Sequence, residues 1–417
     1  MKRLNALYRF LLSIVLAFLT ATAEAQVSPL VRPASSESSA SDNTLNNIKI
    51  SLLTCSPGSE VWSLYGHTAL RLQDPAHGLD VAINWGMFNY NQPYFILRFV
   101  FGLCDYQMGI EPMQAFIDEY RSEGRGVTEQ ELMVTDTEKQ SIIRAIAHDY
   151  QPENRTYRYN FFYDNCTSRA GNMIVDHLNG NFIRTNGSNV ETTWRAMIHQ
   201  WTEKHRWARF GNDLLLGVMA DRKASQTERE FLPDTLRGRF DKAMVVRDGI
   251  RQPIVESTKM LLTPTNETND SDLWNTITPT LFWLAFLCLV VLIEIVEWRR
   301  QRSFIAVDIV LGLVSGVAGL LLFLMIFSKH PTVQVNLQIL ILNPLSLFFT
   351  WPAIRAYRRG NYHLWWRWIY PVCFLIFLVG SFAQDYTEGM YFIALALVSR
   401  CIRPAKKHAM LPFKKVS

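Results

Sequence analysis

The chain has few cysteines, and their spacing excludes the common metal sites. Six cysteines occur in 417 residues, and no group of them has the short spacing of zinc ligands. We therefore predict no metal ion and no cofactor. The last three lie in or beside apolar segments, where cysteine usually serves as a small apolar side chain. A disulfide between Cys55 and Cys104 is compatible with an oxidising compartment and would leave Cys166 free, although the spacing does not establish it.

Acidic side chains are scarce after about residue 278. Residues 278–400 are mostly apolar and aromatic, whereas residues 26–272 are polar and charged with periodic apolar positions. The net charge of +5 does not indicate a nucleic-acid partner, because the basic residues gather beside the apolar segments, where they act as a topology signal. The composition predicts an extramembrane domain followed by a membrane domain.

The N-terminus has the pattern of a secretory signal. A basic start precedes the short apolar stretch Leu11–Leu19, and Ala23-Glu24-Ala25 forms a small-residue cleavage site. We predict a signal peptide over residues 1–25, with an uncleaved anchor as the alternative. Residues 26–47, rich in Ser, Asn, Pro and Ala, are expected to form a flexible lead-in. No cysteine follows the cleavage site directly, so we do not expect the chain to be a lipoprotein itself.

Five apolar segments are predicted to cross a membrane. They run roughly over residues 278–298, 304–327, 337–354, 368–384 and 389–399. Basic clusters follow the first, third and fifth segments, and an exported N-terminal domain would place all three clusters in the cytoplasm. Four spans are the alternative, because the last two segments are short. Glu294, Glu297 and Asp308 lie within or at the ends of the segments near arginines, which favours ion pairing over a functional role.

These patterns divide the rest of the chain into domains. We predict an exported domain over residues 48–262, a linker over 263–277, a membrane domain of about five helices over 278–400 and a cytoplasmic tail over 401–417. Within the exported domain, alternating apolar residues predict a β-hairpin over residues 67–88. Helical periodicity is found over residues 111–124, 135–150 and 167–178, and a short charged helix is predicted at Thr227–Phe231, ended by Pro233. The fold class is therefore α+β, followed by an all-α membrane bundle.

A cysteine and a histidine in this domain fit nucleophilic catalysis. Asn165 or Asp164 offers a helix cap just before Cys166, so the sulfur would lie at a helix N-terminus, where free N–H groups favour a thiolate. The backbone N–H of Cys166 would then be an oxyanion donor. His67 opens the predicted hairpin and is the best candidate base. Asn84, on the second strand, would fix the tautomer of His67 without adding charge.

Three other groups fit this chemistry less well. Cys55 precedes a Ser-Pro-Gly turn, which offers no helix to lower the pKa of its thiol. Cys104 precedes Asp105, whose charge would raise the pKa of a thiol. His177 lies roughly 16 Å from Cys166 along the same predicted helix, at about 1.5 Å per residue, which is too far for a base.

Several segments together resemble a known family. They are Leu53-Thr54-Cys55-Ser56-Pro57-Gly58, Tyr65-Gly66-His67-Thr68-Ala69, Phe101-Gly102 with Asp105-Tyr106, Asn160-Phe161-Phe162-Tyr163-Asp164-Asn165-Cys166-Thr167, and Leu214-Leu215-Leu216-Gly217 with Ala220-Asp221-Arg222. Over about residues 48–245, and in the plan of its membrane region, the chain is similar to the Lnb family of bacterial lipoprotein N-acyltransferases. The resemblance implies a permuted papain-like (NlpC/P60-like) fold in which the catalytic histidine precedes the cysteine. That order matches His67 and Cys166.

The resemblance also implies a reaction and a location. An acyl chain would move from a phospholipid, through a thioester on Cys166, to the α-amine of a diacylglyceryl-cysteine lipoprotein, on the periplasmic side of the bacterial inner membrane. We expect Tyr65 and Arg71 to contact the substrate, Arg71 through a phosphate headgroup, with a solvated strand residue as the alternative for Arg71. Two other functions stay open: a membrane-anchored papain-like peptidase or peptidoglycan amidase that uses the same pair, and a non-enzymatic lipid-binding scaffold.

Overall fold

The structure is a computed structural model that describes most of the chain after residue 46. The described residues are 47–88, 93–184, 191–265, 277–358 and 366–402. The predicted signal peptide, almost all of the lead-in, most of the linker and most of the cytoplasmic tail lie outside the described residues.

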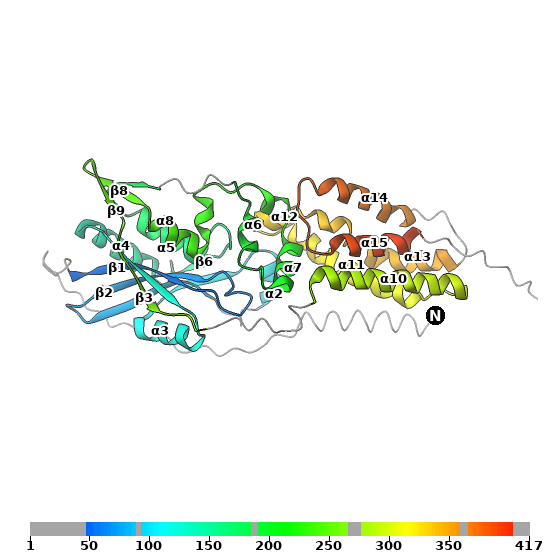
Figure 1. The fold of residues 1–417 in the computed structure, drawn as a ribbon, viewed down its shortest axis with the longest axis horizontal. Coiled ribbons are helices and arrows are strands. Elements are labelled where there is room, and N and C mark those ends of the chain that lie inside the picture. The colour runs from blue at the N-terminus through cyan, green and yellow to red at the C-terminus, as the bar shows by residue number, and fades with distance from the viewer. Residues whose placement is uncertain (1–46, 89–92, 185–190, 266–276, 359–365, 403–417) are drawn as a thin grey trace, which may run out of the picture. The chain divides into compact units, whose positions relative to one another are not determined.

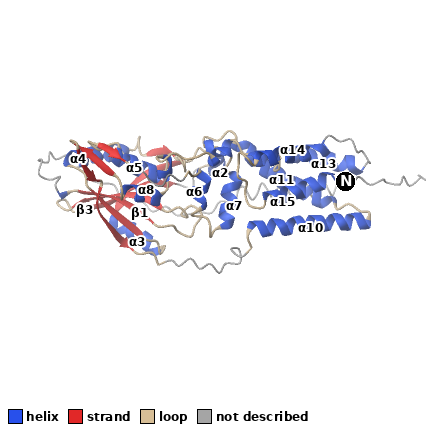
Figure 2. Ribbon diagram, turned by 45° about the horizontal axis from the view of Figure 1, so that its top comes forward, coloured by secondary structure: helices blue, strands red, loops and turns tan. Residues whose placement is uncertain are grey.

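The chain divides into two compact units. Among the described residues, the first comprises those up to Thr202 and those from 222 to 265, and the second comprises Glu203–Asp221 and those from 277 onwards. Strands are found in the first unit, and the described part of the second is helical (Figure 2). Residues 203–221, which the sequence places in the exported domain, thus cluster with the C-terminal helices.

An antiparallel sheet of seven strands is the framework of the first unit. Its strands lie in the order β10-β5-β1-β2-β3-β4-β6. Their bounds are β1 Lys49–Cys55, β2 His67–Asp74, β3 Leu79–Phe88, β4 Asp105–Pro112, β5 Val127–Leu132, β6 Thr156–Arg158 and β10 Val255–Leu262. A smaller sheet holds β7 (Asn181–Ile183), β8 (Met244–Arg247) and β9 (Ile250–Pro253).

Helices cover both faces of the large sheet. α3 (Met113–Ser122) lies on one face, and α4 (Asp136–Asp149), α5 (Cys166–Val175) and α8 (Pro233–Phe240) lie on the other (Figure 1). Because successive residues of a strand point to opposite faces, Leu70 and Ile83 pack into the core that contains α5, whereas Ala69 and Ala82 pack with α3. Three shorter helices complete the unit: α2 (Phe95–Val100), α6 (Trp194–His199) and the 3-10 helix η3 (Glu228–Phe231).

The structure confirms the predicted hairpin and shifts two helix boundaries. The helix predicted from Glu111 begins at Met113, and Glu111 belongs to β4, because a residue that precedes proline is driven to an extended conformation. The charged helix predicted at Thr227–Phe231 is the short η3. This helix ends before Pro233, as predicted. Pro233 also begins α8, since a proline in the first turn gives up an N–H that has no partner there.

The second unit is built from helices of very different length. They are α7 (Arg206–Leu215), η2 (Val218–Asp221), α10 (Pro279–Arg300), α11 (Ile305–Met325), α12 (Pro331–Gln334), η4 (Leu337–Leu340), α13 (Ser346–Arg358), α14 (Trp366–Gly380) and α15 (Met390–Ile402). Within the described part of the chain, α10 and α11 are the two helices long and apolar enough to cross a membrane. The segment predicted over 337–354 is not one helix. It divides into η4 and α13 at Asn343-Pro344, where Asn343 Oδ1 accepts a hydrogen bond from the Leu345 N–H at 3.0 Å.

The acidic residues of the apolar segments form ion pairs, as predicted. Their partner is Arg400 of α15, whose Nη1 lies 2.7 Å from Glu297 Oε2 and whose Nη2 lies 2.8 Å from Asp308 Oδ1. Glu294 lies at the edge of the cluster, 3.9 Å from Arg400. A buried cation with paired carboxylates avoids the large cost of an isolated charge, so the cluster fixes α10, α11 and α15 to one another.

Buried side-chain amides fix residues 203–221 within the helical unit. Gln338 Nε2 donates to the Asp213 carbonyl at 2.8 Å, and Asn336 Nδ2 donates to the Leu214 carbonyl at 2.8 Å. Gln384 Nε2 donates to the carbonyl of Leu216 at 3.0 Å. These bonds satisfy carbonyls at the end of α7, where a helix runs out of its own donors.

Candidate active site

Cys166 is the first residue of α5, and the start of this helix is firmly capped. The side-chain oxygen of Asn165 accepts hydrogen bonds from the N–H groups of Thr167 and Ser168, both at 2.9 Å. Asn165 is only 3% exposed. Its amide nitrogen donates to the Phe161 carbonyl at 2.8 Å and to the Phe231 carbonyl at 2.9 Å. The predicted cap is confirmed. The hydrogen bonds to the Asn165 side-chain oxygen do not use the backbone N–H of Cys166.

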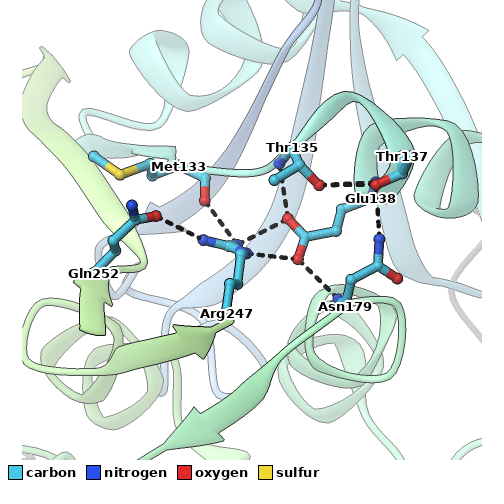
Figure 3. A network of polar contacts seen from close by, with 7 residues as sticks. All are labelled: Met133, Thr135, Thr137, Glu138, Asn179, Arg247 and Gln252. Atoms are coloured by element: carbon cyan, nitrogen blue, oxygen red, sulfur yellow. Dashed lines mark hydrogen bonds and ion pairs between the residues drawn. The ribbon is translucent and has the colours of Figure 1, made fainter. Parts of the chain in front are cut away.

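The chain just after α5 is held by a buried ion pair (Figure 3). Glu138 is fully buried and lies 2.8 Å from both Nε and Nη2 of Arg247. The same carboxylate accepts from the N–H groups of Thr135 at 2.7 Å and Asn179 at 2.8 Å. Burial alone would raise the pKa of Glu138, but the hydrogen bonds from Arg247 and the backbone lower it below its ordinary value. The network therefore joins α4, β8 and the end of the α5 segment.

His67 opens β2 and meets Cys166 there. The His67 ring and the Cys166 side chain both lie next to Gly86, and the two groups shift each other's pKa through charge and hydrogen bonding. His67 Nε2 lies 2.6 Å from Asn84 Oδ1. Because Asn84 engages Nε2, Nδ1 is the ring nitrogen that remains for the sulfur. The turn before His67 requires glycine: Gly66 has a φ of +78°, and a Cβ there would lie 2.6 Å from the Cys55 carbonyl oxygen.

Strand register explains how Asn84 reaches the imidazole. Asn84 of β3 pairs with Ala69 of β2, and Ala69 is two residues beyond His67. Residues two apart on a strand share a face, as do directly paired residues. The structure thus brings together all three residues that the sequence predicts as catalytic.

Gly86 lies against both reacting side chains. A Cβ at this position would be 3.6 Å from the Cys166 Cβ and 3.7 Å from His67 Cε1. Its φ of +114° is accessible to glycine and strained for other residues. The β3–β4 register shifts between Trp85 and Met87, and such a bulge locally redirects a strand. The irregularity therefore accompanies the close approach of α5 to the hairpin.

The pair has the electrostatics of an activated thiol. Burial alone would raise the pKa of Cys166, but the charge and hydrogen bond of His67, the Thr68 backbone N–H and the Thr167 hydroxyl lower it to about 7. Burial alone would lower the pKa of His67, but the charge and hydrogen bond of Cys166 and the hydrogen bond with Asn84 raise it above its ordinary value. Both shifts favour the thiolate–imidazolium form, which is the nucleophilic form of such a pair.

The competing candidates do not have this environment. Burial raises the pKa of the Cys55 thiol to about 12. The pKa of Cys104 is also raised, by burial first and then by the charge of Asp105, although Arg98 opposes the shift. Both cysteines are free thiols, so the disulfide considered from the sequence is not formed. His177 donates locally, from Nδ1 to the Met173 carbonyl of α5 at 2.9 Å.

The two predicted substrate-binding residues have structural contacts. Tyr65 is buried, and the centroid of its ring lies 4.9 Å from that of Phe161. Arg71 lies with Nε and Nη2 each 2.7 Å from the Asp80 carboxylate and with Nη1 3.0 Å from Glu129. These contacts commit the Arg71 guanidinium to two acids, one on the adjacent strand β3 and one on β5 beyond β1, so they do not support headgroup binding. Across the described ranges, no group of three His, Cys, Asp or Glu residues is placed to hold a metal ion.

The comparisons with known families match most of the chain. Residues 36–200 match the Lnb N-terminal periplasmic domain, and residues 269–408 match the Lnb transmembrane domain. The chain belongs to the Lnb family. It is accordingly a membrane protein with a mixed α/β periplasmic domain and a helical C-terminal region, and the order of His67 and Cys166 agrees with a permuted papain-like arrangement. No curated protein and no solved structure shows significant similarity to it.

Three groups of this Lnb site escaped the prediction. Gly86 lies inside a strand pattern, where a glycine often marks a bulge or a close approach. The Thr68 N–H and the Thr167 hydroxyl each belong to the residue that follows a predicted catalytic one. Their contribution depends on how β2 and α5 meet, which no local pattern encodes.

Proposed function

We propose that this Lnb protein is a lipoprotein N-acyltransferase that uses Cys166 as its nucleophile. The observation that carries the proposal is the thiol at a capped helix start, whose pKa is lowered by a histidine that is itself held at Nε2 by Asn84. The acyl donor is a phospholipid, and the acceptor is a lipoprotein with a diacylglyceryl-modified N-terminal cysteine. Both substrates are anchored in a bilayer, which gives a reason for a transmembrane domain in an enzyme of this kind.

The first half-reaction transfers the acyl chain to the enzyme. The Cys166 thiolate attacks the carbonyl carbon of the phospholipid ester, and a C–S bond forms. The backbone N–H of Cys166 stabilises the oxyanion. The C–O bond of the ester then breaks, and the departing lysophospholipid oxygen takes the proton of the His67 imidazolium. Cys166 is left as a thioester and His67 as neutral imidazole.

The second half-reaction transfers the acyl chain to the lipoprotein. The neutral α-amine attacks the thioester carbon, and His67 accepts the proton that the amine loses. The C–S bond breaks as the amide bond forms, which restores the thiolate and the imidazolium. Water has to be kept from the thioester, because hydrolysis would release a fatty acid in place of the amide.

The charge pattern supports an inner-membrane, multi-pass arrangement with the catalytic domain in the periplasm. Arg299 and Arg300 lie in the last turn of α10, and Arg355 and Arg400 lie near the ends of α13 and α15. If the N-terminal domain is exported, these ends lie on the cytoplasmic side, as the positive-inside rule requires.

Complementation tests the proposal. A bacterial strain that lacks its own lipoprotein N-acyltransferase would receive the wild type, Cys166→Ala, His67→Ala or the control Cys104→Ala. We expect the wild type and Cys104→Ala to restore triacylated N-termini in mass spectra of lipoproteins, and the two site variants to leave them diacylated. Diacylated N-termini with the wild type, or a Cys166→Ala variant with full activity, would refute the acyltransferase proposal. Cleavage of peptide or peptidoglycan amides would favour a hydrolase.

A further inference from the structure

An additional acidic residue lies in line with the imidazole and the amide. Glu111 of β4 is two residues beyond Gly109, which pairs with Asn84. On the other side of β3, Asn84 pairs with Ala69, two residues from His67. Since paired residues and residues two apart share a face, His67, Asn84 and Glu111 form a diagonal row across three adjacent strands.

Glu111 interacts with both other members of this row. The strand register places Glu111 diagonally next to Asn84. Burial raises the pKa of the Glu111 carboxyl group, whereas hydrogen bonding by the Asn84 side chain and the charge of His67 both lower it. A carboxylate only accepts hydrogen bonds, so the Asn84 amide nitrogen donates to Glu111. The amide oxygen is then left to face His67 Nε2, 2.6 Å away.

We propose that Glu111 is a positioning residue for the thiol site. Its carboxylate holds the Asn84 amide in the orientation that accepts from His67, and its negative charge stabilises the imidazolium beside the Cys166 thiolate. If the amide turned over, its NH2 group would face the Nε2–H of His67 and the hydrogen bond would be lost. The inference deepens the proposed function by adding a residue to the same site, but its chemistry needs no lipid.

Other ionisable groups surround the row and the sulfur. Burial raises the pKa of Glu111, and the nearby charge of Glu119 on α3 raises it further, whereas Asn84 and His67 act in the opposite direction. Arg125 opposes the protonation of His67. The remaining groups that interact with Cys166 are Cys55, Tyr157 and Tyr159, whose own pKa values are raised, chiefly by burial. Among these, Glu119 provides the matched control, because it is an exposed carboxylate in the same neighbourhood.

The test measures the alkylation of Cys166 against pH in the full-length protein in detergent micelles. Iodoacetamide is added, and mass spectrometry of the Cys166 peptide separates this site from the other thiols. For Glu111→Gln we expect the pH midpoint of the alkylation-rate profile to rise by about one unit. From a starting pKa of about 7, this rise lowers the thiolate fraction at pH 7 about fivefold. Glu119→Gln is expected to leave the midpoint unchanged.

A double-mutant cycle shows whether Glu111 acts through Asn84. In an Asn84→Ala background, Glu111→Gln should change the midpoint much less than in the wild type, because coupled residues are not additive. An undiminished effect there, or no effect in the wild-type background, overturns the proposal. If Glu111→Gln is not produced as folded protein, Glu111→Asp decides: a smaller rise of the midpoint supports the proposal, and an unchanged midpoint overturns it.

This readout separates the inference from the proposed function. A protein that shows the expected alkylation profiles but transfers no acyl chain would refute the acyltransferase and leave the role of Glu111 intact. A protein that restores triacylated lipoproteins but shows no effect of Glu111→Gln would do the reverse.

Discussion

The side-chain hydroxyls of Thr68 and Thr167 lie 3.1 Å apart, although 99 positions separate the two residues in the chain. Each threonine directly follows a residue of the thiol–imidazole pair. The bond therefore joins β2 to the first turn of α5 at the point where His67 must reach Cys166. Both threonines are fully buried, so this contact is protected from water.

The Thr167 hydroxyl also touches the sulfur, which makes its removal informative. It lies 3.8 Å from Cys166 Sγ and is one of the groups that lower the pKa of the thiol. Thr167→Val removes the hydroxyl but keeps the shape. We expect the alkylation midpoint of Cys166 to rise by a few tenths of a pH unit and the protein to lose about 1 kcal/mol of stability. Ser168→Ala, which alters the cap but not the sulfur contact, is the control; equal midpoints for wild type and Thr167→Val would contradict this role.

His67→Ala tests the dominant influence on the thiol. The charge and hydrogen bond of the imidazole lower the pKa of Cys166, so their loss should raise the pKa and reduce the rate of alkylation at pH 7. The rate should then keep rising with pH above 8, whereas the wild-type rate should approach a plateau. His177→Ala removes a histidine from the end of the same helix region and should leave the profile unchanged. If the plateau persists in His67→Ala, the imidazole does not lower the pKa of the Cys166 thiol, and the prediction is wrong.

Gly86→Ala tests the close packing of the site. Alanine at a φ of +114° is strained by about 1–3 kcal/mol, and its Cβ would enter the space between Cys166 and His67. We expect lower thermal stability and slower alkylation at pH 7. Gly238→Ala is the matched control, because a Cβ there meets no atom within 4 Å and the residue lies in α8. Alanine in a helix should be neutral or stabilising by up to about 1 kcal/mol.

The Glu138–Arg247 pair predicts a dependence of stability on pH. The pKa of Glu138 is lowered in the folded protein, so its contribution is present above the unfolded pKa and is lost as the pH falls through the folded one. Glu138→Gln should cost about 3 kcal/mol at pH 7, with the difference from wild type shrinking below about pH 4. The thermal unfolding of the full-length protein in detergent at both pH values measures this.

A surface pair provides the comparison for that variant. Glu131 is paired with Lys49, whose side chain is 51% exposed, and exposed pairs contribute at most about 1 kcal/mol. Glu131→Gln should therefore change the unfolding temperature little at either pH. A Glu138→Gln variant as stable as Glu131→Gln at pH 7 would show that the buried network is not an important link between α4, β8 and the segment after α5.

The sequence predicted those parts of the fold that short patterns determine. The hairpin over 67–88 alternates apolar and polar residues, and Asn165, which directly precedes Cys166, caps α5. β5 was not predicted, because Val127–Leu132 contains mostly polar residues. Its Gln130 is fully buried, and Gln130 Nε2 donates to the Arg237 carbonyl at 3.1 Å, a partner more than a hundred positions away that no local pattern reveals.

The candidate site shows the same division. His67 and Cys166 follow from the chemistry of their neighbours and from the resemblance, and Asn84 from the order of the strands. Glu111 was assigned to a helix because its neighbours have helical periodicity. Its contact with Asn84 is diagonal and depends on the exact β3–β4 register, including the shift near Gly86, which the sequence does not define.

The most direct measurement of the account is the capture of an acyl group on Cys166. Full-length protein in detergent micelles is incubated with a phospholipid of known acyl chains, quenched in acid and digested, and the peptides are examined by mass spectrometry. We expect the Cys166 peptide to carry one acyl chain in a hydroxylamine-sensitive bond, and the chain to move to the N-terminus of an added diacylglyceryl-cysteine peptide. A Cys166 peptide that stays unmodified while the added peptide becomes N-acylated would contradict the thioester, and with it the role assigned to the thiol–imidazole pair.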